Sequence, residues 1–256
     1  MARQPVTRGG GKPRFCYDYP RPAFAVDMVV LAVRDPELEL LLIRRRDPPY
    51  RGRWALPGGF VEVRDDGDQG EDLDDAAARE LQEETGLRPR EVWLQQFHTF
   101  GRPGRDPRGR VISVGYFALV PPHLSPQAGD DAIAAQWLPL SRVRTLSLAF
   151  DHAQMLEVAL RVIRQRAADE LPLVARLVPR EFTKLELRRA LELVGGQRLD
   201  QSNFNKRFNR MIDEGAIVRL DGVRARSRPG RPAELHRFAG SPRGGRARRT
   251  RPRTPG

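Results

Sequence analysis

The chain of 256 residues carries 45 basic and 33 acidic side chains and has a formal net charge of +12. Its single cysteine, Cys16, excludes disulfides within the chain and any metal site built on several thiolates, and it fits a reducing cytosol. The longest apolar run begins at Phe24, contains Asp27 and is far shorter than the roughly 18 residues of a membrane span, so we expect a cytoplasmic protein with no membrane partner.

The positive charge is concentrated in the last third of the chain. Residues 1–170 hold 24 basic and 25 acidic side chains, whereas residues 171–256 hold 21 and 8. Domains average roughly 100 to 200 residues, so the length and the uneven charge predict two domains. A basic domain is typical of a protein that binds an anionic polymer, because neutralised phosphates release counterions; solubility alone is the alternative. The expected divisions are a flexible basic arm at 1–20, a first domain at 21–170, a second at 171–238 and a disordered arginine-rich tail at 239–256.

Strands and helices alternate along the first domain. The expected elements are strands at 24–34 and 38–46 around a turn at Asp35-Pro36, a helix from near Asp72, strands at 91–100 and 111–120, and a helix at 151–166. Apolar residues recur at helical spacing in the last segment, and Asp151 fits its N-cap. Strands interleaved with two helices predict an α/β or α+β sandwich.

The basic domain has the element order of a winged helix-turn-helix. Residues 183–194 predict a helix that is capped by Thr183 and ended by Gly195-Gly196. A second helix is expected within 202–215. Its apolar stripe consists of Phe204, Phe208, Met211 and Ile212. Two short strands around an arginine- and proline-rich loop follow, and helix, turn, helix and basic hairpin is the order of this fold.

Three glutamates converge on the first predicted helix. Glu80, Glu83 and Glu84 stand at i, i+3 and i+4, so their carboxylates share one face. Without a cation they repel one another, whereas Mg²⁺ or Mn²⁺ removes the repulsion and keeps coordination sites for phosphate and water. The preceding Gly58-Gly59 turn lets a ligand approach the backbone closely, and Arg79 is placed to orient a carboxylate. A solvated acidic helix face is the alternative.

At these residues the sequence resembles the Nudix hydrolase family, whose motif is Gly, five residues, Glu, seven residues, and Arg-Glu-hydrophobic-x-Glu-Glu-x-Gly-hydrophobic. The matching positions are Glu71, Arg79, Glu80, Leu81, Glu83, Glu84, Gly86 and Leu87. The resemblance implies an α/β/α sandwich, catalytic roles for Glu71, Arg79, Glu80, Glu83 and Glu84, and a metal held by Gly59, Glu80, Glu83 and Glu84. Eleven residues separate Gly59 from Glu71 where the motif has five, so six residues are inserted. We expect them to form a surface excursion that leaves both ends in place.

A second stretch, Phe97 to Leu119, supplies guanidinium groups suited to a diphosphate. Arg105, Arg108 and Arg110 surround Asp106, whose carboxylate either binds a ribose hydroxyl or pairs with the arginines. The stretch resembles Nudix domains that bind ADP-ribose in NAD metabolism, as does "LAFDH" at 148–152. A salt-bridged turn is the alternative, and we expect structural roles for His98 and His152. The expected ligand-binding residues are Arg53, Phe60, Arg105, Asp106, Arg108 and Arg110.

The two domains together resemble the Nudix-related transcriptional regulators of NAD biosynthesis genes, on "LDQSNFNKRF" and "GRPAELHRF" in the second domain. The resemblance implies a homodimeric repressor that senses ADP-ribose and binds palindromic double-stranded DNA. If the complete motif is active, the protein also cleaves ADP-ribose to AMP and ribose 5-phosphate. The alternative is mainly an enzyme, an ADP-ribose pyrophosphatase or a related hydrolase. The expected DNA contacts are Asn203, Asn205, Lys206, Arg207 and Arg210 on the second helix and Arg224, Arg226, Arg228 and Arg231 in the wing.

Overall fold

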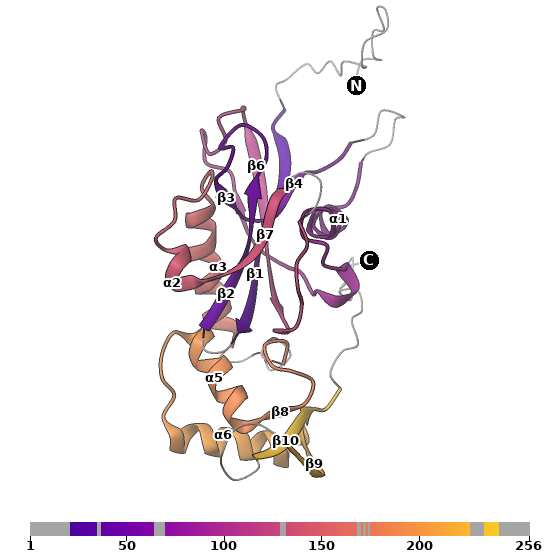
Figure 1. Cartoon of the computed structure of the whole chain (residues 1–256), viewed down its shortest axis with the longest axis vertical. Coiled ribbons are helices and arrows are strands. Elements are labelled where there is room, and N and C mark those ends of the chain that lie inside the picture. The colour runs from indigo at the N-terminus through magenta and orange to yellow at the C-terminus, as the bar shows by residue number, and fades with distance from the viewer. Residues whose placement is uncertain are drawn as a thin grey trace, which may run out of the picture.

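A seven-stranded mixed sheet forms the centre of the first domain (Figure 1). The computed structural model describes residues 21–34, 37–63, 70–128, 132–167, 170, 173, 175–225 and 233–240. The strands are β1 (Ala23–Arg34), β2 (Glu37–Arg45), β3 (Trp54–Ala55), β4 (Gly58–Phe60), β5 (Gln95–Phe100), β6 (Val111–Val120) and β7 (Ala132–Pro139). They follow the order β3, β2, β1, β6, β5, with β4 paired to β1 and β7 paired to β2. The expected arm at 1–20, the turn at Asp35-Pro36 and the tail from 241 lie outside the described residues.

The central strand β1 supplies side chains to two apolar cores. It runs parallel to β6, with Val30 opposite Ala118, and antiparallel to β2, with Leu31 opposite Leu40. Successive side chains of a strand point to opposite faces, so Leu31 lies in one core cluster and Val30 in the other. Both are fully buried, as expected for a strand that is covered on two sides.

A helix covers each face of the sheet (Figure 1). α1 (Leu73–Thr85) packs Leu81 into the core that contains Val30, and α3 (His152–Ala167) packs Ile163 into the core that contains Leu31. Two short helices, η1 (Pro89–Glu91) and α2 (Leu140–Val143), lie in the connections. The first domain is therefore the expected α/β/α sandwich. None of the helices in the described ranges has both the length and the apolar character needed to cross a membrane.

Two expectations for the strands need correction. The strand expected at 91–100 begins only at Gln95, because Pro89 starts a 3₁₀ turn that ends at Glu91. Strand β7 was not expected, since its sequence "AIAAQWLP" contains three alanines and ends in proline, residues with a weak preference for strands. Its conformation comes from antiparallel pairing along β2, where Leu41 lies opposite Trp137.

The second domain is the expected winged helix-turn-helix. It contains β8 (Phe182–Thr183), α5 (Lys184–Gly195), α6 (Gln201–Asp213), β9 (Ile217–Ala225) and β10 (Ala233–Phe238), and its sheet has the order β8, β10, β9. Thr183 and Glu186 form a reciprocal capping box at the start of α5, and Gly196 ends the helix in the left-handed conformation at φ 70°. The apolar residues of this domain join the same core cluster as α3, so the two domains share a buried contact.

Candidate functional site

The glutamates of the motif gather where α1 faces β4. Asp72 caps α1 by accepting a hydrogen bond from the backbone N–H of Asp74, and Gly86 ends the helix at φ 68°. Strand β4 pairs with β1 and brings Gly59 against the carboxylate of Glu80. A Cβ at Gly59 would collide with that carboxylate, so any larger residue here would displace Glu80.

Arg79 is the hub of the carboxylate cluster. Its guanidinium donates two hydrogen bonds to Glu71, at 3.0 and 2.6 Å, and one each at 2.9 Å to Glu80 and Glu83. A further bond of 3.1 Å reaches the backbone carbonyl of Phe60. The bonds to Glu71, followed by those to Glu80 and Glu83, hold the pKa of Arg79 above its ordinary value although burial opposes this. Arg79 therefore fastens α1 to β4 and neutralises part of the acidic charge.

The two ends of the inserted segment are tied together at this hub. The backbone N–H of Glu71 donates to the carbonyl of Glu62 at 3.1 Å, and the N–H of Glu62 donates to the Glu71 carboxylate at 2.9 Å. Residues 64–69 lie outside the described residues. The chain thus leaves and rejoins the site at adjacent positions, and Glu71 reaches Arg79 despite the longer spacing.

Glu84 and Glu80 are shielded from water. Glu84 is 7% exposed and accepts a hydrogen bond from the N–H of Gly58 at 2.7 Å. Burial raises the pKa of Glu84 to about 8 against the opposing effect of that hydrogen bond, and the charges of Glu80 and Asp27 add to the rise. Burial also raises the pKa of Glu80. Both pKa shifts indicate that an added positive charge beside Glu80 and Glu84 would be favourable.

The donor atoms of the cluster are of the kind that a hard divalent cation prefers. In this structure, however, the carboxylates are bonded to other groups of the protein and are not arranged around a metal ion. Mg²⁺ and Mn²⁺ prefer oxygen donors such as the carboxylates of Glu80, Glu83 and Glu84 and the carbonyl of Gly59. Among the residues that the structure describes, no three acidic, histidine or cysteine side chains are gathered closely enough to hold a metal ion. Glu80 and Glu83 are bonded to Arg79, and Glu84 to Gly58. The expected residues are therefore neighbours with the right chemistry, but they form an arginine-neutralised cluster rather than a closed ligand set.

A cavity of about 440 Å³ opens beside the cluster. Its lining combines the acidic residues Glu62, Glu80, Glu83 and Glu84 with the basic residues Arg45, Arg46 and Arg108 and the rings of Phe60 and Phe150. The Arg108 guanidinium lies 4.6 Å from the centre of the Phe60 ring and 5.4 Å from that of Phe150. Guanidinium groups suit phosphates and aromatic rings suit a planar base, so the cavity can take a nucleotide with a diphosphate.

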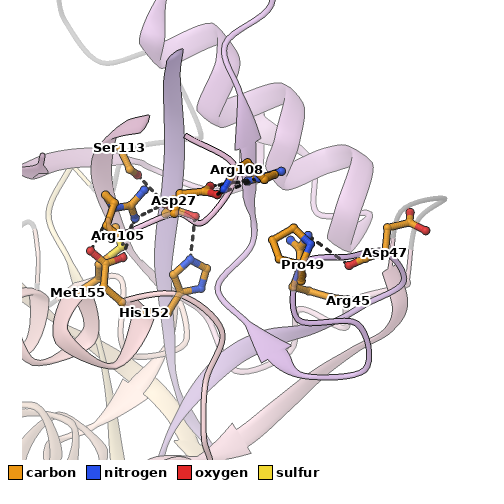
Figure 2. A network of polar contacts seen from close by, with 11 residues as sticks. Asp27, Arg45, Asp47, Pro49, Arg105, Arg108, Ser113, His152 and Met155 are labelled. Atoms are coloured by element: carbon orange, nitrogen blue, oxygen red, sulfur yellow. Dashed lines mark hydrogen bonds and ion pairs between the residues drawn. The ribbon is translucent and has the colours of Figure 1, made fainter. Parts of the chain in front are cut away.

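Arg105, expected to bind the ligand, lines the cavity and is also engaged in a buried ion-pair network (Figure 2). It donates to Asp151 at 3.0 and 2.7 Å and to Asp27 at 3.4 Å. Ser113 donates to Asp27 at 2.5 Å, and Nε2 of His152 lies 3.3 Å from the same carboxylate. Burial opposes the ionisation of Asp27, but the contacts with His152, Ser113 and Arg105 lower its pKa to about 2. Arg105 thus forms the salt bridges of the alternative and also lines the cavity, so its contact with a ligand stays a prediction.

His152 has the structural role that was expected. Its Nδ1 accepts a hydrogen bond from the backbone N–H of Leu56 at 2.8 Å, so the proton of the neutral ring is on Nε2, toward Asp27. His98 is exposed on β5 and packs edge-on against Phe100, with ring centres 4.8 Å apart. Neither histidine is placed as a catalyst by these contacts.

The other expected ligand residues fall into two groups. Phe60, Asp106 and Arg108 line the cavity, and the buried Asp106 accepts hydrogen bonds of 2.7 to 3.2 Å from Arg108. Arg53 and Arg110 are not among the lining residues. Arg53 donates to Ser147 at 3.2 Å, and Arg110 donates to the carbonyl of Gly101 at 2.6 Å. In this structure those two arginines stabilise loops outside the cavity.

Sequence reasoning did not identify Asp27, Arg45 and Phe150 as cavity residues. Asp27 is a charged residue within the apolar run of β1, which is a usable signal, because a buried carboxylate needs partners. Arg45 ends β2 and donates to the carbonyl of Pro49 at 2.9 Å (Figure 2). Phe150 lies within "LAFDH" and has φ 50°, a conformation that is uncommon for a bulky residue and was not evident from the sequence.

The second domain presents a polar helix face. Asp200 caps α6 through the N–H of Asn203, and Phe204, Phe208 and Met211 are buried beneath the helix. Of the expected DNA contacts on α6, Asn203, Lys206 and Arg210 are exposed, and Asn205 and Arg207 are half-buried. In the wing, the backbone of Arg224 pairs with Glu234 in β10. The side chain of Arg224 and all of Arg226, Arg228 and Arg231 lie outside the described residues.

Comparison with known proteins matches two parts of the chain to two family models. Residues 23–159 match the NUDIX domain, and residues 174–238 match the NrtR DNA-binding winged helix domain. Over 223 residues the chain is 35% identical to the ADPR responsive transcriptional repressor NtrR of Acinetobacter baylyi, which covers 87% of this chain and 84% of that protein. The chain belongs to the NrtR family.

Two further similarities describe the two halves of this NrtR family member. The crystal structure of Shewanella oneidensis NrtR complexed with a 27mer DNA has a TM-score of 0.68 and 30% identity, and the match covers 84% of this chain and 93% of that one. The NUDIX half is 39% identical over 140 residues to the ADP-ribose pyrophosphatase of Methanocaldococcus jannaschii, covering 54% of this chain and 73% of that protein. The whole two-domain fold is thus that of an NrtR protein, and its NUDIX domain is related to a hydrolase.

Proposed function

We propose that this protein is an ADP-ribose-responsive transcriptional repressor of NAD biosynthesis genes and that its NUDIX domain hydrolyses the ligand. The observation that carries the proposal is the presence in one chain of a polar, aromatic-lined cavity and a winged helix with a polar α6 face. The relationship to the Acinetobacter baylyi repressor spans both domains and supports the same pairing of ligand sensing with DNA binding.

In the proposed complex, the cavity recognises both the charge and the planar base of ADP-ribose. Arg45, Arg46 and Arg108 supply positive charge for the diphosphate, and Phe60 and Phe150 offer rings against which the base stacks. Arg105 keeps its structural bonds to Asp151 and positions the loop that carries Arg108. The expected contacts from Arg53 and Arg110 remain proposals, and they require those side chains to leave Ser147 and Gly101.

Hydrolysis requires the glutamate cluster to accept a divalent cation. Glu80, Glu83, Glu84 and the carbonyl of Gly59 are the groups that would hold Mg²⁺ or Mn²⁺, which supplies charge stabilisation and an activated water when bound. Arg79 must share Glu80 and Glu83 with that ion, and Glu71 holds Arg79 in place while it does so. Gly58 orients Glu84 through its backbone N–H. The products are AMP and ribose 5-phosphate.

DNA binding is assigned to α6 and the wing of a homodimer. Asn203, Lys206 and Arg210 are exposed on one helix, and asparagine suits adenine while arginine suits guanine in the major groove. Asn205 and Arg207 flank this face, and the wing arginines at 224, 226, 228 and 231 are proposed to contact phosphates or the minor groove. Two copies related by a two-fold axis require a palindromic site with half-sites about 34 to 36 Å apart or a multiple of that distance.

The test is a DNA shift assay with purified full-length protein. The probe is a duplex that the protein selects from a random-sequence pool, titrated with and without ADP-ribose in EDTA, with AMP as the control ligand. The proposal expects a specific complex that ADP-ribose dissolves and AMP does not. A complex that survives saturating ADP-ribose would overturn regulation by this ligand.

A protein that is mainly a hydrolase is the second candidate. It is favoured by the complete glutamate motif, by the closure of the insertion at Glu62 and Glu71, and by the relationship to an ADP-ribose pyrophosphatase. This candidate predicts rapid turnover of ADP-ribose with Mg²⁺ or Mn²⁺ and no sequence-selective DNA complex. The same shift assay, run beside a turnover assay, separates the two.

A further inference from the structure

Three consecutive residues at the start of α3 are fastened to the lining of the cavity. The Phe150 ring lies 5.0 Å from the guanidinium of Arg45 and 5.4 Å from that of Arg108. Asp151 accepts two hydrogen bonds from Arg105, and His152 contacts Asp27 (Figure 2). The N-terminal end of α3 is therefore attached to the cavity through a cation–π stack, an ion pair and a histidine hydrogen bond.

The polar attachments centre on buried residues, which makes them sensitive to small displacements. Asp27 and His152 are 7% and 3% exposed, and the Arg105 side chain is 4% exposed. Charged hydrogen bonds are strong in such a low-dielectric setting, and leaving one unmade is costly. The lining and the first turn of α3 must then move together rather than separately.

Phe150 is the attachment that contacts two of the cavity arginines. Both arginines at its ring line the cavity, and a diphosphate that draws Arg45 or Arg108 toward itself removes a contact from this ring. The residue also has φ 50°, a conformation that is strained for a bulky side chain. Loss of an arginine contact from the Phe150 ring therefore favours a change in the backbone conformation directly before α3.

The other end of α3 contacts the winged helix domain. α3 has 16 residues and so extends about 24 Å. Near its C-terminal end, Nε of Arg164 donates to the carbonyl of Val194 at 3.4 Å. The Arg164 guanidinium also lies against Gly196, 3.3 Å from where a Cβ would stand. The helix thus joins the cavity to the end of α5.

Helix α5 is in turn tied to the turn that leads into α6. Arg188 donates to the carbonyl of Leu199 at 2.8 Å, and the N–H of Leu199 donates to Glu192 at 3.0 Å. Arg188 and Glu192 also pair with each other at 2.9 Å. The neighbouring Asp200 caps α6. A displacement of α5 by α3 is therefore passed to α6, the helix proposed to read DNA.

We infer that α3 is the element that couples the cavity to the DNA-binding domain. Ligand binding displaces the helix through Phe150, Asp151 and His152, and Arg164 passes the displacement to α5. This inference rests on the proposed function and adds the residues through which the ligand acts. Ligand can release DNA only if it binds the DNA-incompetent arrangement more tightly. The contacts at the two ends of α3 differ between the DNA-competent and the DNA-incompetent arrangement. The residues that form these contacts position other groups and do not touch DNA.

The experiment compares Asp151→Asn and Arg164→Ala with the wild type and with Arg161→Ala. Asp151→Asn keeps the shape and one acceptor for Arg105, and Arg164→Ala removes the contact with α5 from an exposed position. Arg161 is an exposed arginine on the same helix and is the matched control. Each full-length protein is titrated with the selected duplex alone, with ADP-ribose alone, and with both, in EDTA so that the ligand is not consumed.

The measured quantity is the coupling factor, the ratio of the DNA dissociation constants with and without saturating ADP-ribose. A factor of about 100 in the wild type is within the usual range for allosteric proteins. Both test variants should bind each partner alone nearly as the wild type does, while their coupling factor falls by at least about 10-fold. A merely structural role would instead weaken one of the separate affinities.

The outcomes distinguish this inference from the proposed function. Absence of coupling in the wild type would refute the ADP-ribose response itself. If both test variants keep the coupling factor of the wild type, the role of α3 is overturned and the proposed function is not. Hydrogen exchange supplies a second readout: ADP-ribose should change exchange within 184–195 in the wild type and in Arg161→Ala but not in Asp151→Asn. An unchanged response in a folded Asp151→Asn protein also contradicts the inference.

Discussion

Arg79 donates hydrogen bonds to both carboxylate oxygens of Glu71, at 3.0 and 2.6 Å. The remaining donors of the same guanidinium hold Glu80, Glu83 and the carbonyl of Phe60. Glu71 thus orients the arginine that orients the two glutamates, and it does so from the far side of a six-residue insertion. The geometry of the site depends on this pair more than on any direct contact of Glu71 with the cavity.

The first prediction concerns this pair. Glu71→Gln should lower the rate of ADP-ribose hydrolysis by about 10- to 100-fold, because partners that orient metal-binding groups typically contribute that much. Arg79→Lys should lose a similar amount, since an ammonium group cannot bond Glu71 in the same forked geometry. Turnover with Mn²⁺ is the measurement, and the exposed Arg90→Ala is the control. Wild-type turnover in both variants would show that the hub is dispensable.

The second prediction separates hydrolysis from sensing. Glu83→Gln should reduce turnover by about 100-fold, as is usual when a group that stabilises the transition state is removed. Glu83 lines the cavity but is not among the residues proposed to contact the diphosphate or the base, so the variant should still bind ADP-ribose. After a single dose of ADP-ribose with Mg²⁺, its DNA complex should remain dissociated longer than that of the wild type. Equal recovery times would contradict removal of the inducer by hydrolysis.

The third prediction tests the insertion. Deleting residues 64–69 would leave a two-residue connection, Val63-Gly70, between the hydrogen-bonded Glu62 and Glu71. Two-residue connections suit paired antiparallel segments, and Gly70 already has φ 92°. The shortened protein should therefore keep its Tm and its turnover. Deleting residues 63–70 is the control, and it should abolish turnover because Glu62 and Glu71 could no longer pair.

The fourth prediction follows from the lowered pKa of Asp27. Its folded pKa of about 2 lies below its ordinary value of 3.8, so its contribution of about 2 kcal/mol is complete above the ordinary value and is lost as the pH falls toward 2. Asp27→Asn should flatten this acid limb of the stability curve and lower stability at pH 7 by about 3 kcal/mol, because a buried ion pair is broken. Urea unfolding between pH 2 and pH 7 measures both effects, with the exposed Asp75→Asn as the control. A parallel acid limb in Asp27→Asn and the wild type would disprove the assignment.

The fifth prediction distinguishes base contacts from phosphate contacts. Arg210→Ala should weaken the selected duplex by about 1 to 3 kcal/mol and affect random DNA less, as expected for a side chain that reads a base. Arg226→Ala and Arg228→Ala should weaken both duplexes and reduce the salt dependence of binding by about one ion each. Fluorescence anisotropy at several salt concentrations gives both quantities. If all three variants bind like the wild type, the basic domain is not the DNA reader.

The features that the sequence determined are those whose partners lie within a few residues. Asp72, Thr183 and Gly196 were identifiable as helix ends because a cap bonds to its own first or last turn. The glutamates share one face of α1 because helical periodicity puts them there, whatever the rest of the fold does. The apolar stripe of α6 was predictable for the same reason, and burial of Phe204 and Phe208 follows from it.

Only the tertiary structure decided what distant residues do to one another. Arg105 lines the cavity and meets Asp151 and Asp27 across 46 and 78 positions of the chain, so a guanidinium expected to bind a ligand is also bonded within the protein. Strand β7 is extended because it pairs with β2. Glu71 keeps its position near Arg79 despite the insertion because its backbone is hydrogen-bonded to Glu62. Long-range pairing of this kind depends on the packing of the whole sheet, which local periodicity does not encode. The sequence therefore determined which groups are present on each element, and the fold determined which of them remain available for a ligand.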